Sequence, residues 1–357
     1  MLKWIEIDLN ILAGNVRAIR KALKPGVDFM AVIKADGYGH GAAAAGKTAL
    51  ENGADCLGAL TADEGAALRR IFPKAAIHLL APSLPEETPL IIKNNQVPTA
   101  DSINFIRTLD RAAIKAAPYH LDIDLGVGRW GVKPETAETL LLKAVEFRKI
   151  RPVGVSAHLA YRPAQNMTET EEKLSAFSAL ADRLRALAPG LKAHAANSSV
   201  LCDFPHWQLD MVRIGNLMYG IYPTDVYKKK NQGTPLPGLG RPWRFYARII
   251  SVKKVKKGEP LGYAGEFTAP RAMRLATIPA GYSDGLTMEP TENKIRITSG
   301  FRYWGIINGK KAFFTGRIGI AHTMLDVTDI PEAVPGTPVA LHVRRTAANA
   351  KIPRIYK

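Results

Sequence analysis

Short apolar or β-branched runs alternate with amphipathic stretches from residue 28 to about residue 215. The runs are typical of buried strands, and the stretches between them have the 3.6-residue apolar period of helices. One stretch, TADEGAALRRI, opens with the capping-box spacing Thr61-x-x-Glu64, and another is TETEEKLSAFSALADRLRALA. Strands are predicted at 28–33, 55–60, 76–81, 96–99, 119–124, 152–158, 192–196 and 210–214. Eight such units favour a TIM-like (β/α)8 barrel over an open doubly wound sheet.

The pattern changes in the last third of the chain. Residues 229–242 are rich in Gly, Pro and Lys without any period, so they are predicted to be a linker. Short alternating strands separated by Gly and Pro follow: WRFYARIISVKKV, RLATIPA, KIRITSG, RYWGIING, KAFFTGRIGI and TPVALHV. We therefore predict an α/β chain with a barrel at 9–228 and an all-β domain at 243–357.

Charge raises the question of a nucleic-acid partner. The 357-residue chain has 49 Lys and Arg against 32 Asp and Glu, a net charge of +17, which would attract anions. The basic residues are spread along the chain, however, and the two dense runs, at 228–230 and 253–257, lack interleaved aromatic residues. These runs are typical of solvated surface, and we predict no nucleic-acid partner.

Cysteine usage and hydropathy bound the compartment. Cys56 and Cys202 lie far apart without metal-ligand spacing, so neither a disulfide framework nor a metal site is indicated. No window approaches the roughly 18 apolar residues of a membrane span, and the N-terminus lacks a long apolar run. We expect a soluble, cytoplasmic protein without membrane attachment.

One short motif indicates nucleotide binding. Residues 41–48, GAAAAGKT, match the P-loop pattern G-x-x-x-x-G-K-[ST]. A P-loop needs a flexible backbone directly after a strand, whereas the four variable positions here are all alanine, the strongest helix former. The predicted strand also ends at Ile33, eight residues earlier. A helix with Lys47 exposed on it is the favoured interpretation, and a P-loop NTPase stays as an alternative.

Lys34 carries a second chemical hypothesis. It directly follows an apolar strand, so in a barrel its amine would lie at the catalytic, C-terminal face. Burial there shifts a lysine toward the neutral amine that attacks carbonyl groups. Taken alone, Lys34 would more simply be a surface lysine at a strand end.

The surroundings of Lys34, AVIKADGYGHG, resemble the pyridoxal-phosphate lysine motif of alanine racemases. The resemblance continues in order through most of the chain, in LDIDLGVGRWG, VSAHLA, HAANSSVLCDFP, DMVRIGNLMYGIYP, LGYAGEFTA, ATIPAGYSDGL, INGKKAFFTGRIGI and KIPR. It implies a pyridoxal 5'-phosphate enzyme that interconverts L- and D-alanine, supplying D-alanine for the bacterial cell wall. It also implies a homodimer with shared active sites, in which the N-terminal strand, 1–8, joins the C-terminal β domain.

Racemisation requires a proton to leave Cα on one face and return on the other, so two bases are the economical solution. By resemblance, Lys34 holds the cofactor and is the base on the D face. Tyr282, from the other subunit, would be the base on the L face. His158 would be its neighbour in a hydrogen-bond chain that reaches Arg213. His158 alone would more simply be a satisfied core histidine.

The resemblance also implies binding roles. Arg213 would contact the cofactor's ring nitrogen, to which an arginine cannot in practice give a proton. Arg129 would bind near the cofactor's phenolic oxygen and the substrate carboxylate, and the backbone N–H of Ile320 would bind that carboxylate too. The phosphate would be held by Tyr38, Ser198, Gly215 and Asn216, with Asn197 nearby.

Three positions depart from the family pattern. Asp122 stands where a lysine, often carbamylated, commonly holds the arginine that corresponds to Arg129. We predict that the Asp122 carboxylate partly replaces that anion, with water between. Ile320 and Ala321 replace a usual Met-Asp pair, and Ala350 replaces a tyrosine that is a phosphate ligand. Serine or broad-specificity racemisation therefore stays as an alternative, as does a non-catalytic cofactor-binding protein, which usually lacks the β domain.

Overall fold

A computed structural model describes residues 1–223, 236, 238–262, 265, 267–286, 289–291, 294–296, 304–341, 343 and 348–357. The chain divides into two compact units. The barrel unit is Leu9–Arg241, and the β unit combines Met1–Asp8 with Pro242–Lys357. Most of the predicted linker, and the basic run 228–230, fall among residues 224–235 and 237, outside the described residues.

The barrel unit contains all eight predicted strands in one parallel sheet. They are β2 (Asp28–Val32), β3 (Cys56–Ala59), β4 (Ala76–Pro82), β5 (Val97–Ala100), β6 (Ala117–Asp124), β7 (Ile150–His158), β8 (Lys192–His194) and β9 (Met211–Ile214). The sheet order is β8-β7-β6-β5-β4-β3-β2-β9. Backbone bonds from Asp210 N to Ala193 O and from Arg213 N to Ala196 O join its two edges. The predicted TIM-like barrel is thus confirmed as a nearly closed one.

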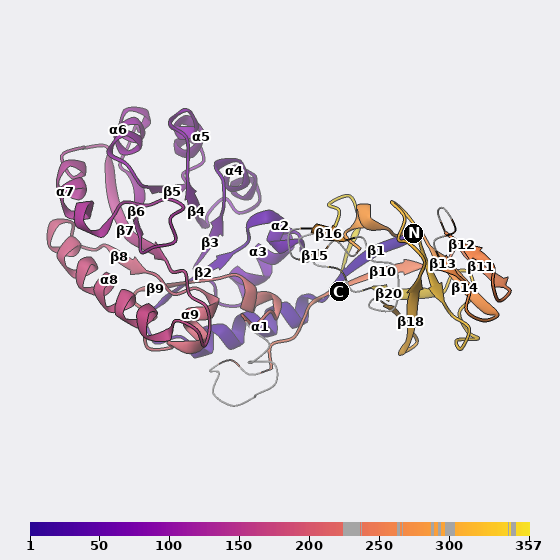
Figure 1. The fold of residues 1–357 in the computed structure, drawn as a ribbon. Coiled ribbons are helices and arrows are strands. Elements are labelled where there is room, and N and C mark those ends of the chain that lie inside the picture. Colours follow the sequence, from indigo (N-terminus) through magenta and orange to yellow (C-terminus); the bar gives the residue numbers. More distant parts are fainter. Residues whose placement is uncertain are drawn as a thin grey trace. The chain divides into compact units, whose positions relative to one another are not determined.

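Helices cover the outside of these strands (Figure 1). They are α1 (Leu9–Ala22), α3 (Ala42–Glu51), α4 (Ala62–Ile71), α5 (Thr88–Lys93), α6 (Ile103–Ala112), α7 (Pro134–Ala144) and α8 (Met167–Leu187), with the short α9 (Ser198–Asp203). In α6, Phe105, Ile106 and Leu109 are buried, the spacing of one helical face. Ser102 caps its first turn by accepting from Phe105 N. Each fully buried large apolar side chain contributes about 1.5–3 kcal/mol.

The P-loop-like segment is helical. The four alanines and Lys47 all lie within α3, as their helix propensity predicts. The Lys47 side chain is 70% exposed and lies 3.9 Å from Glu51, one helical turn on. No phosphate cradle is formed by this segment, so the P-loop alternative is discarded.

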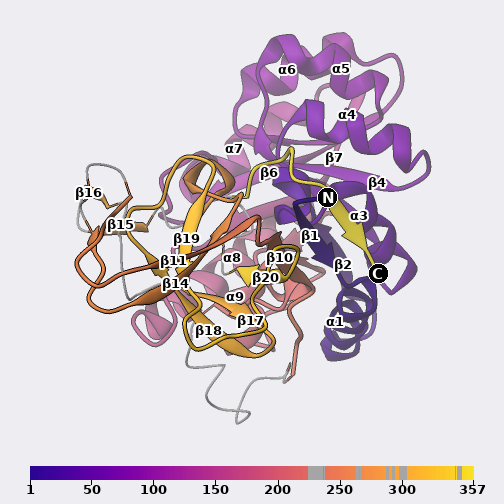
Figure 2. The same ribbon diagram turned by 90° about the vertical axis from the view of Figure 1, so that its right-hand side faces the viewer.

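The β unit is built around a nine-stranded sheet (Figure 2). Its strands are β1 (Lys3–Ile7), β10 (Trp243–Arg248), β11 (Ser251–Val255), β14 (Met273–Ile278), β17 (Trp304–Ile307), β18 (Lys310–Thr315), β19 (Thr323–Asp326), β20 (Pro338–Leu341) and β21 (Arg354–Tyr356). The order is β11-β14-β19-β18-β17-β20-β10-β1-β21, so the N-terminal strand lies between β10 and the last strand. Two pairs complete the described strands: β12 (Pro260–Leu261) with β13 (Phe267–Thr268), and β15 (Glu289–Thr291) with β16 (Lys294–Arg296). The all-β character predicted for this part of the chain is confirmed.

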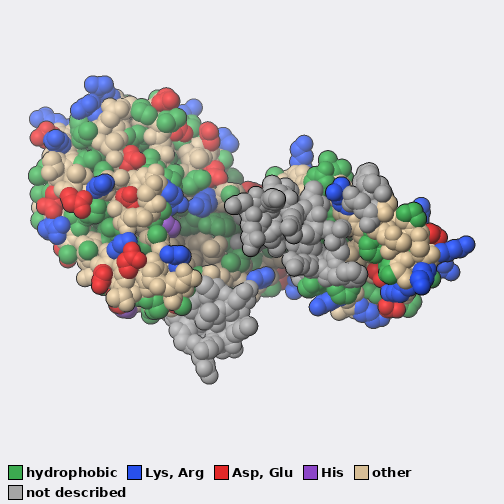
Figure 3. Space-filling model, viewed as in Figure 1, with side chains coloured by type: hydrophobic (Ala, Val, Ile, Leu, Met, Phe, Trp, Pro, Cys, Tyr) green, Lys and Arg blue, Asp and Glu red, His purple; other side chains and the backbone are tan. Residues whose placement is uncertain are grey.

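The surface charge is dispersed on the face shown in Figure 3, where Lys and Arg alternate with Asp and Glu. Among the helices described, none is both long and apolar enough to cross a membrane. Both cysteines are buried, and neither is in a disulfide. Within the same residues, no group of three or more His, Cys, Asp and Glu is arranged to hold a metal ion.

Candidate active site

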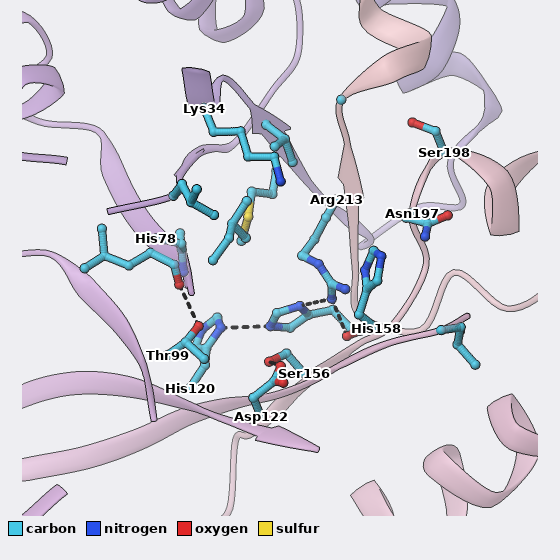
Figure 4. A pocket seen from close by; sticks show the side chains of 18 of the residues that line it. Lys34, His78, Thr99, His120, Asp122, Ser156, His158, Asn197, Ser198 and Arg213 are labelled. Atoms are coloured by element: carbon cyan, nitrogen blue, oxygen red, sulfur yellow. Dashed lines mark hydrogen bonds between the residues drawn. The ribbon is translucent and has the colours of Figure 1, made fainter. Parts of the chain in front are cut away.

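A cavity of about 370 Å³ lies at the carboxyl ends of the barrel strands. It brings together nine residues singled out from the sequence: Lys34, Tyr38, Arg129, His158, Asn197, Ser198, Arg213, Gly215 and Asn216. These residues are up to 182 positions apart in the sequence (34 to 216). They meet because they lie at or near the carboxyl ends of strands of one barrel. Lys34 follows β2 and Arg213 lies in β9, two strands that pair with each other, and Figure 4 shows both side chains in this space.

Lys34 opens an unusual turn at the end of β2. The short α2 (Lys34–Tyr38) contains left-handed backbone, with φ of 51° at Ala35, 52° at Asp36, 61° at Gly37 and 55° at Tyr38. Left-handed backbone costs a residue other than glycine roughly 1–2 kcal/mol. Lys34 and Tyr38, at the two ends of this turn, both line the cavity. Such strain persists only where surrounding contacts enforce it.

The electrostatics of the cavity are dominated by cations. Burial lowers the pKa of Lys34, and Arg129 and Arg213 lower it further, while Glu64 acts in the opposite direction. Burial likewise lowers the pKa of Arg213 to about 10, which leaves the guanidinium charged at neutral pH. The result is an amine shifted toward its neutral form between two fixed positive charges, in a space suited to an anionic ligand.

Arg213 is held by a chain of histidines. Its Nη1 lies 2.6 Å from His194 Nδ1, and its Nη2 donates to the carbonyl oxygen of Ala157 at 2.6 Å. His194 Nε2 lies 2.8 Å from His120 Nδ1 (Figure 4). Because a guanidinium only donates, Nδ1 of His194 accepts, and its proton therefore lies on Nε2 and is donated to His120. The guanidinium bonds to the ring and the carbonyl of His194, and among the described residues no hydrogen bond joins it to His158. The chain that links Tyr282, His158 and Arg213 stays a prediction.

These rings are neutral. Burial, reinforced by neighbouring positive charge, holds the pKa of His120 and His194 well below 6.5. Burial and then Arg213 and Arg129 lower the pKa of His158 to about 3. His78, whose ring centroid lies 4.8 Å from that of His120, has its pKa lowered to about 4, again chiefly by burial. Arg213 is therefore surrounded by imidazole dipoles that stabilise its charge without neutralising it.

Asp122 is the buried acid of the cavity. The Ser156 hydroxyl donates to its Oδ1, but burial outweighs this bond and the two nearby arginines and raises the pKa of Asp122 to about 6. Among the described residues, neither Arg129 nor Arg213 comes within ion-pair distance of this carboxylate. A small cavity of about 10 Å³, about one water-sized probe, is lined by Asp122, Arg129 and His158.

The loop that carries Arg129 is closed by backbone contacts. Asp124 accepts from Gly126 N at 2.9 Å and Gly128 N at 3.0 Å. Gly131 has φ of 99°, and a Cβ there would lie 2.7 Å from Asp124 N and 3.0 Å from an Asp122 carboxylate oxygen. Glycine is therefore required for this loop to pack against Asp122. Arg129 stacks over the Trp130 ring, 4.4 Å from its centroid.

Hydroxyl and amide groups gather where β9, which pairs with β2, leads into a short 3-10 turn, Asn216–Tyr219. The Tyr38 hydroxyl lies only 2.6 Å from where a Cβ of Gly215 would stand, so the glycine makes room for it. Ser198 accepts from Leu217 N at 3.4 Å. Asn197 caps α9 with its side-chain oxygen, which accepts from Ser199 N and Val200 N.

Tyr282 and Ile320 meet within the β unit. Tyr282 begins the 3-10 turn Tyr282–Asp284, and its N–H donates to Gly319 O at 3.1 Å. Ser283 donates to Ile320 O from both its N–H and its hydroxyl, at 3.0 and 2.6 Å. Ile320 is 55% exposed. Asp284, 2% exposed, anchors the turn by accepting from Lys3 Nζ at 2.7 Å and from Gly281 N.

Several cavity residues were not found from the sequence. His78, Thr99, His120, Ser156, Trp130, Tyr161 and His194 all line it. The sequence carried a signal for His120, because it lies two positions before Asp122 in β6 and the two side chains therefore share a face of the strand. Nothing local in the sequence places His78 or His194 beside it.

Two family profiles cover the chain. The profile described as alanine racemase, N-terminal domain, matches residues 7–223, and that of the C-terminal domain matches residues 243–355. An alanine racemase of Desulfosudis oleivorans is 32% identical over 352 residues, covering 95% of this chain and 86% of the relative. One of Halothermothrix orenii is 31% identical over 343 residues, with coverage of 95% and 86%.

Solved structures agree. Alanine racemase of Clostridium difficile 630 superposes with a TM-score of 0.91 at 25% identity, covering 100% of this chain and 96% of that one. The Streptomyces coelicolor A3(2) enzyme gives 0.85 at 28% identity, with coverage of 99% and 98%. Two matched domain profiles, relatives above 30% identity over nearly the whole chain and the same two-part fold lead to one conclusion. This chain belongs to the alanine racemase family.

Proposed function

We propose that this protein interconverts L- and D-alanine with pyridoxal 5'-phosphate bound through Lys34. The observation that carries the proposal is Lys34 itself: an amine of lowered pKa at the end of a barrel strand, in a 370 Å³ cavity with two arginines. A neutral amine is the form that reacts with an aldehyde, and the arginines complement a phosphate and a carboxylate.

The residues present fit this cofactor. Tyr38 and Ser198 supply hydroxyls and Gly215 and Asn216 supply backbone next to them, the donor set that a phosphate requires. The close approach of the Tyr38 hydroxyl to Gly215 leaves a cradle that a Cβ would fill. When bound, pyridoxal phosphate supplies an electron sink that stabilises negative charge on the substrate's Cα.

Two groups of the chain would move the proton. Lys34 Nζ would remove or return it on one face of Cα, and the Tyr282 phenolic oxygen would do so on the other. A tyrosine oxygen is a base only after losing its own proton. His158 is neutral because burial lowers its pKa to about 3, so it would accept a hydrogen bond from the Tyr282 hydroxyl and orient it without taking its proton.

The arginines would set the polarity of the reaction. Arg213 stays charged and can only donate, so it would hold a ring nitrogen without protonating it. Arg129, on its glycine-closed loop, would bind the substrate carboxylate together with the Ile320 N–H. Asp122 would steady Arg129 through a water in the 10 Å³ cavity beside them.

We further propose a homodimer in which Tyr282 and Ile320 complete the partner's cavity, and a cytoplasmic location. The two-unit organisation supports the first, because Tyr282 and Ile320 lie in one unit and Lys34 in the other. The absence of a disulfide between Cys56 and Cys202 is compatible with the second. Light scattering of the purified protein tests the dimer: a monomer active at the same concentration would contradict it.

The function is tested by a visible absorption spectrum, borohydride trapping and circular dichroism. We expect a yellow protein, a reduced pyridoxyl adduct on the Lys34 peptide by mass spectrometry, and loss of optical activity from L-alanine and D-alanine. L-serine is assayed in parallel. An adduct without alanine turnover would redirect the substrate, and a colourless protein that takes up no pyridoxal phosphate would refute the cofactor.

A further inference from the structure

Glu64 contacts the turn that carries Lys34. It lies in the first turn of α4, where its N–H is capped by the Thr61 hydroxyl at 3.3 Å. In an ordinary capping box its carboxylate would return to the Thr61 N–H. Here Oε1 instead accepts from Ala35 N at 2.8 Å and Oε2 from Leu60 N at 2.7 Å. One carboxylate therefore ties the end of β3 to the residue that follows Lys34.

This contact holds the strained side of the turn. Ala35 is the first of five consecutive residues with positive φ, three of which are not glycine. A second side-chain bond ties the turn to the helix that follows it, because Asp36 Oδ1 accepts from Ala42 N, the first residue of α3, at 2.8 Å. By contrast, the side chain that accepts from Ala35 N is Glu64, which belongs to the next strand-helix unit, β3 and α4. A charge-assisted hydrogen bond at Ala35 N offsets part of the cost of such a backbone.

Glu64 also acts on the amine through its charge. Burial, Arg129 and Arg213 all lower the pKa of Lys34, and the Glu64 carboxylate raises it. Removing that carboxylate therefore leaves the amine with only the influences that favour its neutral form.

We propose that Glu64 is a positioning residue that holds the Lys34 amine in place by clamping Ala35 N to the end of β3. The proposal rests on the proposed function only in what the amine is positioned for, namely the capture of pyridoxal phosphate. The clamp itself, and its effect on the amine, belong to the protein without any cofactor.

The test uses three full-length variants. Glu64→Gln keeps the shape but offers one acceptor oxygen in place of two, and Glu64→Ala removes both. Glu87→Gln is the matched control, because Glu87 also accepts a backbone N–H at a helix start, from Leu84 at 2.7 Å, whereas the bond to Ala35 N comes from Glu64. Thermal unfolding of each variant reports whether the fold is retained.

The first measurement needs no cofactor. Competitive labelling with trace acetic anhydride across pH, read by mass spectrometry of the Lys34 peptide, gives the pKa of that amine. We expect the labelling midpoint to move to lower pH in both Glu64 variants and to stay in Glu87→Gln. If Glu64 served only to stabilise the fold, the labelling midpoint of Lys34 would stay where it is. An unchanged midpoint in Glu64→Ala would therefore overturn the electrostatic part of the proposal.

The second measurement is the rate at which cofactor-free protein captures pyridoxal phosphate at Lys34, trapped with borohydride. Loss of a hydrogen bond to a charged group predicts a decrease of about 10- to 100-fold in Glu64→Ala. We expect a smaller decrease in Glu64→Gln and none in Glu87→Gln. Wild-type capture with an undiminished rate in Glu64→Ala would overturn the clamp. No capture by wild type would refute the proposed function instead, leaving the labelling result to judge Glu64.

Discussion

Asp122→Asn should make the protein more stable and less active. The pKa of Asp122 is raised from 3.8 to about 6, and at about 1.36 kcal/mol per pH unit this difference corresponds to roughly 3 kcal/mol. The sign follows from the direction of the shift. Below about pH 4 the carboxyl is protonated in both states and contributes nothing. Above about pH 6 the folded state holds a carboxylate that the unfolded state solvates better.

An asparagine resembles the protonated acid, so it removes this penalty. At pH 7.5 we expect the free energy of unfolding to rise by about 3 kcal/mol, which for a barrel unit of this size raises the melting temperature by roughly 6–12 °C. The gain should shrink toward zero as the pH falls to about 4. Calorimetry of wild type and Asp122→Asn at pH 7.5 and pH 4 measures this difference. If the variant were no more stable than wild type at pH 7.5, the reasoning would be refuted.

Asp124→Asn is the matched control, because Asp124 lies two residues further along the same strand, at its end. Hydrogen bonds from Gly128 N and Gly126 N lower the pKa of Asp124, so its charge stabilises the folded state at neutral pH and is lost as acid protonates it. That variant should therefore lose stability at pH 7.5. If Asp122 steadies Arg129 as proposed, Asp122→Asn should also lower kcat/KM for alanine, and undiminished activity would remove Asp122 from the site.

Three further predictions concern other contacts. His78→Leu should raise the free energy of unfolding by about 1–3 kcal/mol in urea titrations, because it removes a buried Nδ1 that has no hydrogen-bond partner among the described residues. A loss of stability of the same size would show that this nitrogen is hydrogen-bonded. Gly215→Ala should weaken pyridoxal phosphate binding in a fluorescence titration, since its Cβ would lie 2.6 Å from the Tyr38 hydroxyl; unchanged affinity would exclude this wall as the phosphate site. Lys3→Met should destabilise the protein by about 3–5 kcal/mol, because it leaves the buried Asp284 carboxylate unpaired; Lys3→Met with Asp284→Asn should recover part of the loss, and no recovery would contradict the pairing.

Much of the site was predictable because its residues sit at strand ends. The apolar run before Lys34 placed its amine at the carboxyl end of a strand. His158 and Arg213 were singled out by resemblance, and they lie in β7 and β9. The loop that carries Arg129 has positive φ at Gly126, Gly128 and Gly131. The helix propensity of four alanines was enough to remove Lys47 from a phosphate-binding role.

Other features needed the closed barrel. The partner of Arg213 was predicted to be His158, but the imidazole that reaches it is His194, from the strand beside it. The Thr61-x-x-Glu64 spacing predicted a helix start correctly, yet the Glu64 carboxylate bonds to Ala35, 29 residues away. Asp122 was recognised as an anion near Arg129, but its raised pKa depends on burial.

The sequence by itself determined the order of strands and helices, the change to an all-β pattern and the position of Lys34 after a strand. These depend on periodicity and propensity, which act between residues a few positions apart. Only the tertiary structure decided the left-handed turn, the histidine chain beside Arg213 and the raised pKa of Asp122. Their physical causes are hydrogen-bond partners brought together from different strands and the exclusion of water from the barrel, neither of which exists until the sheet closes.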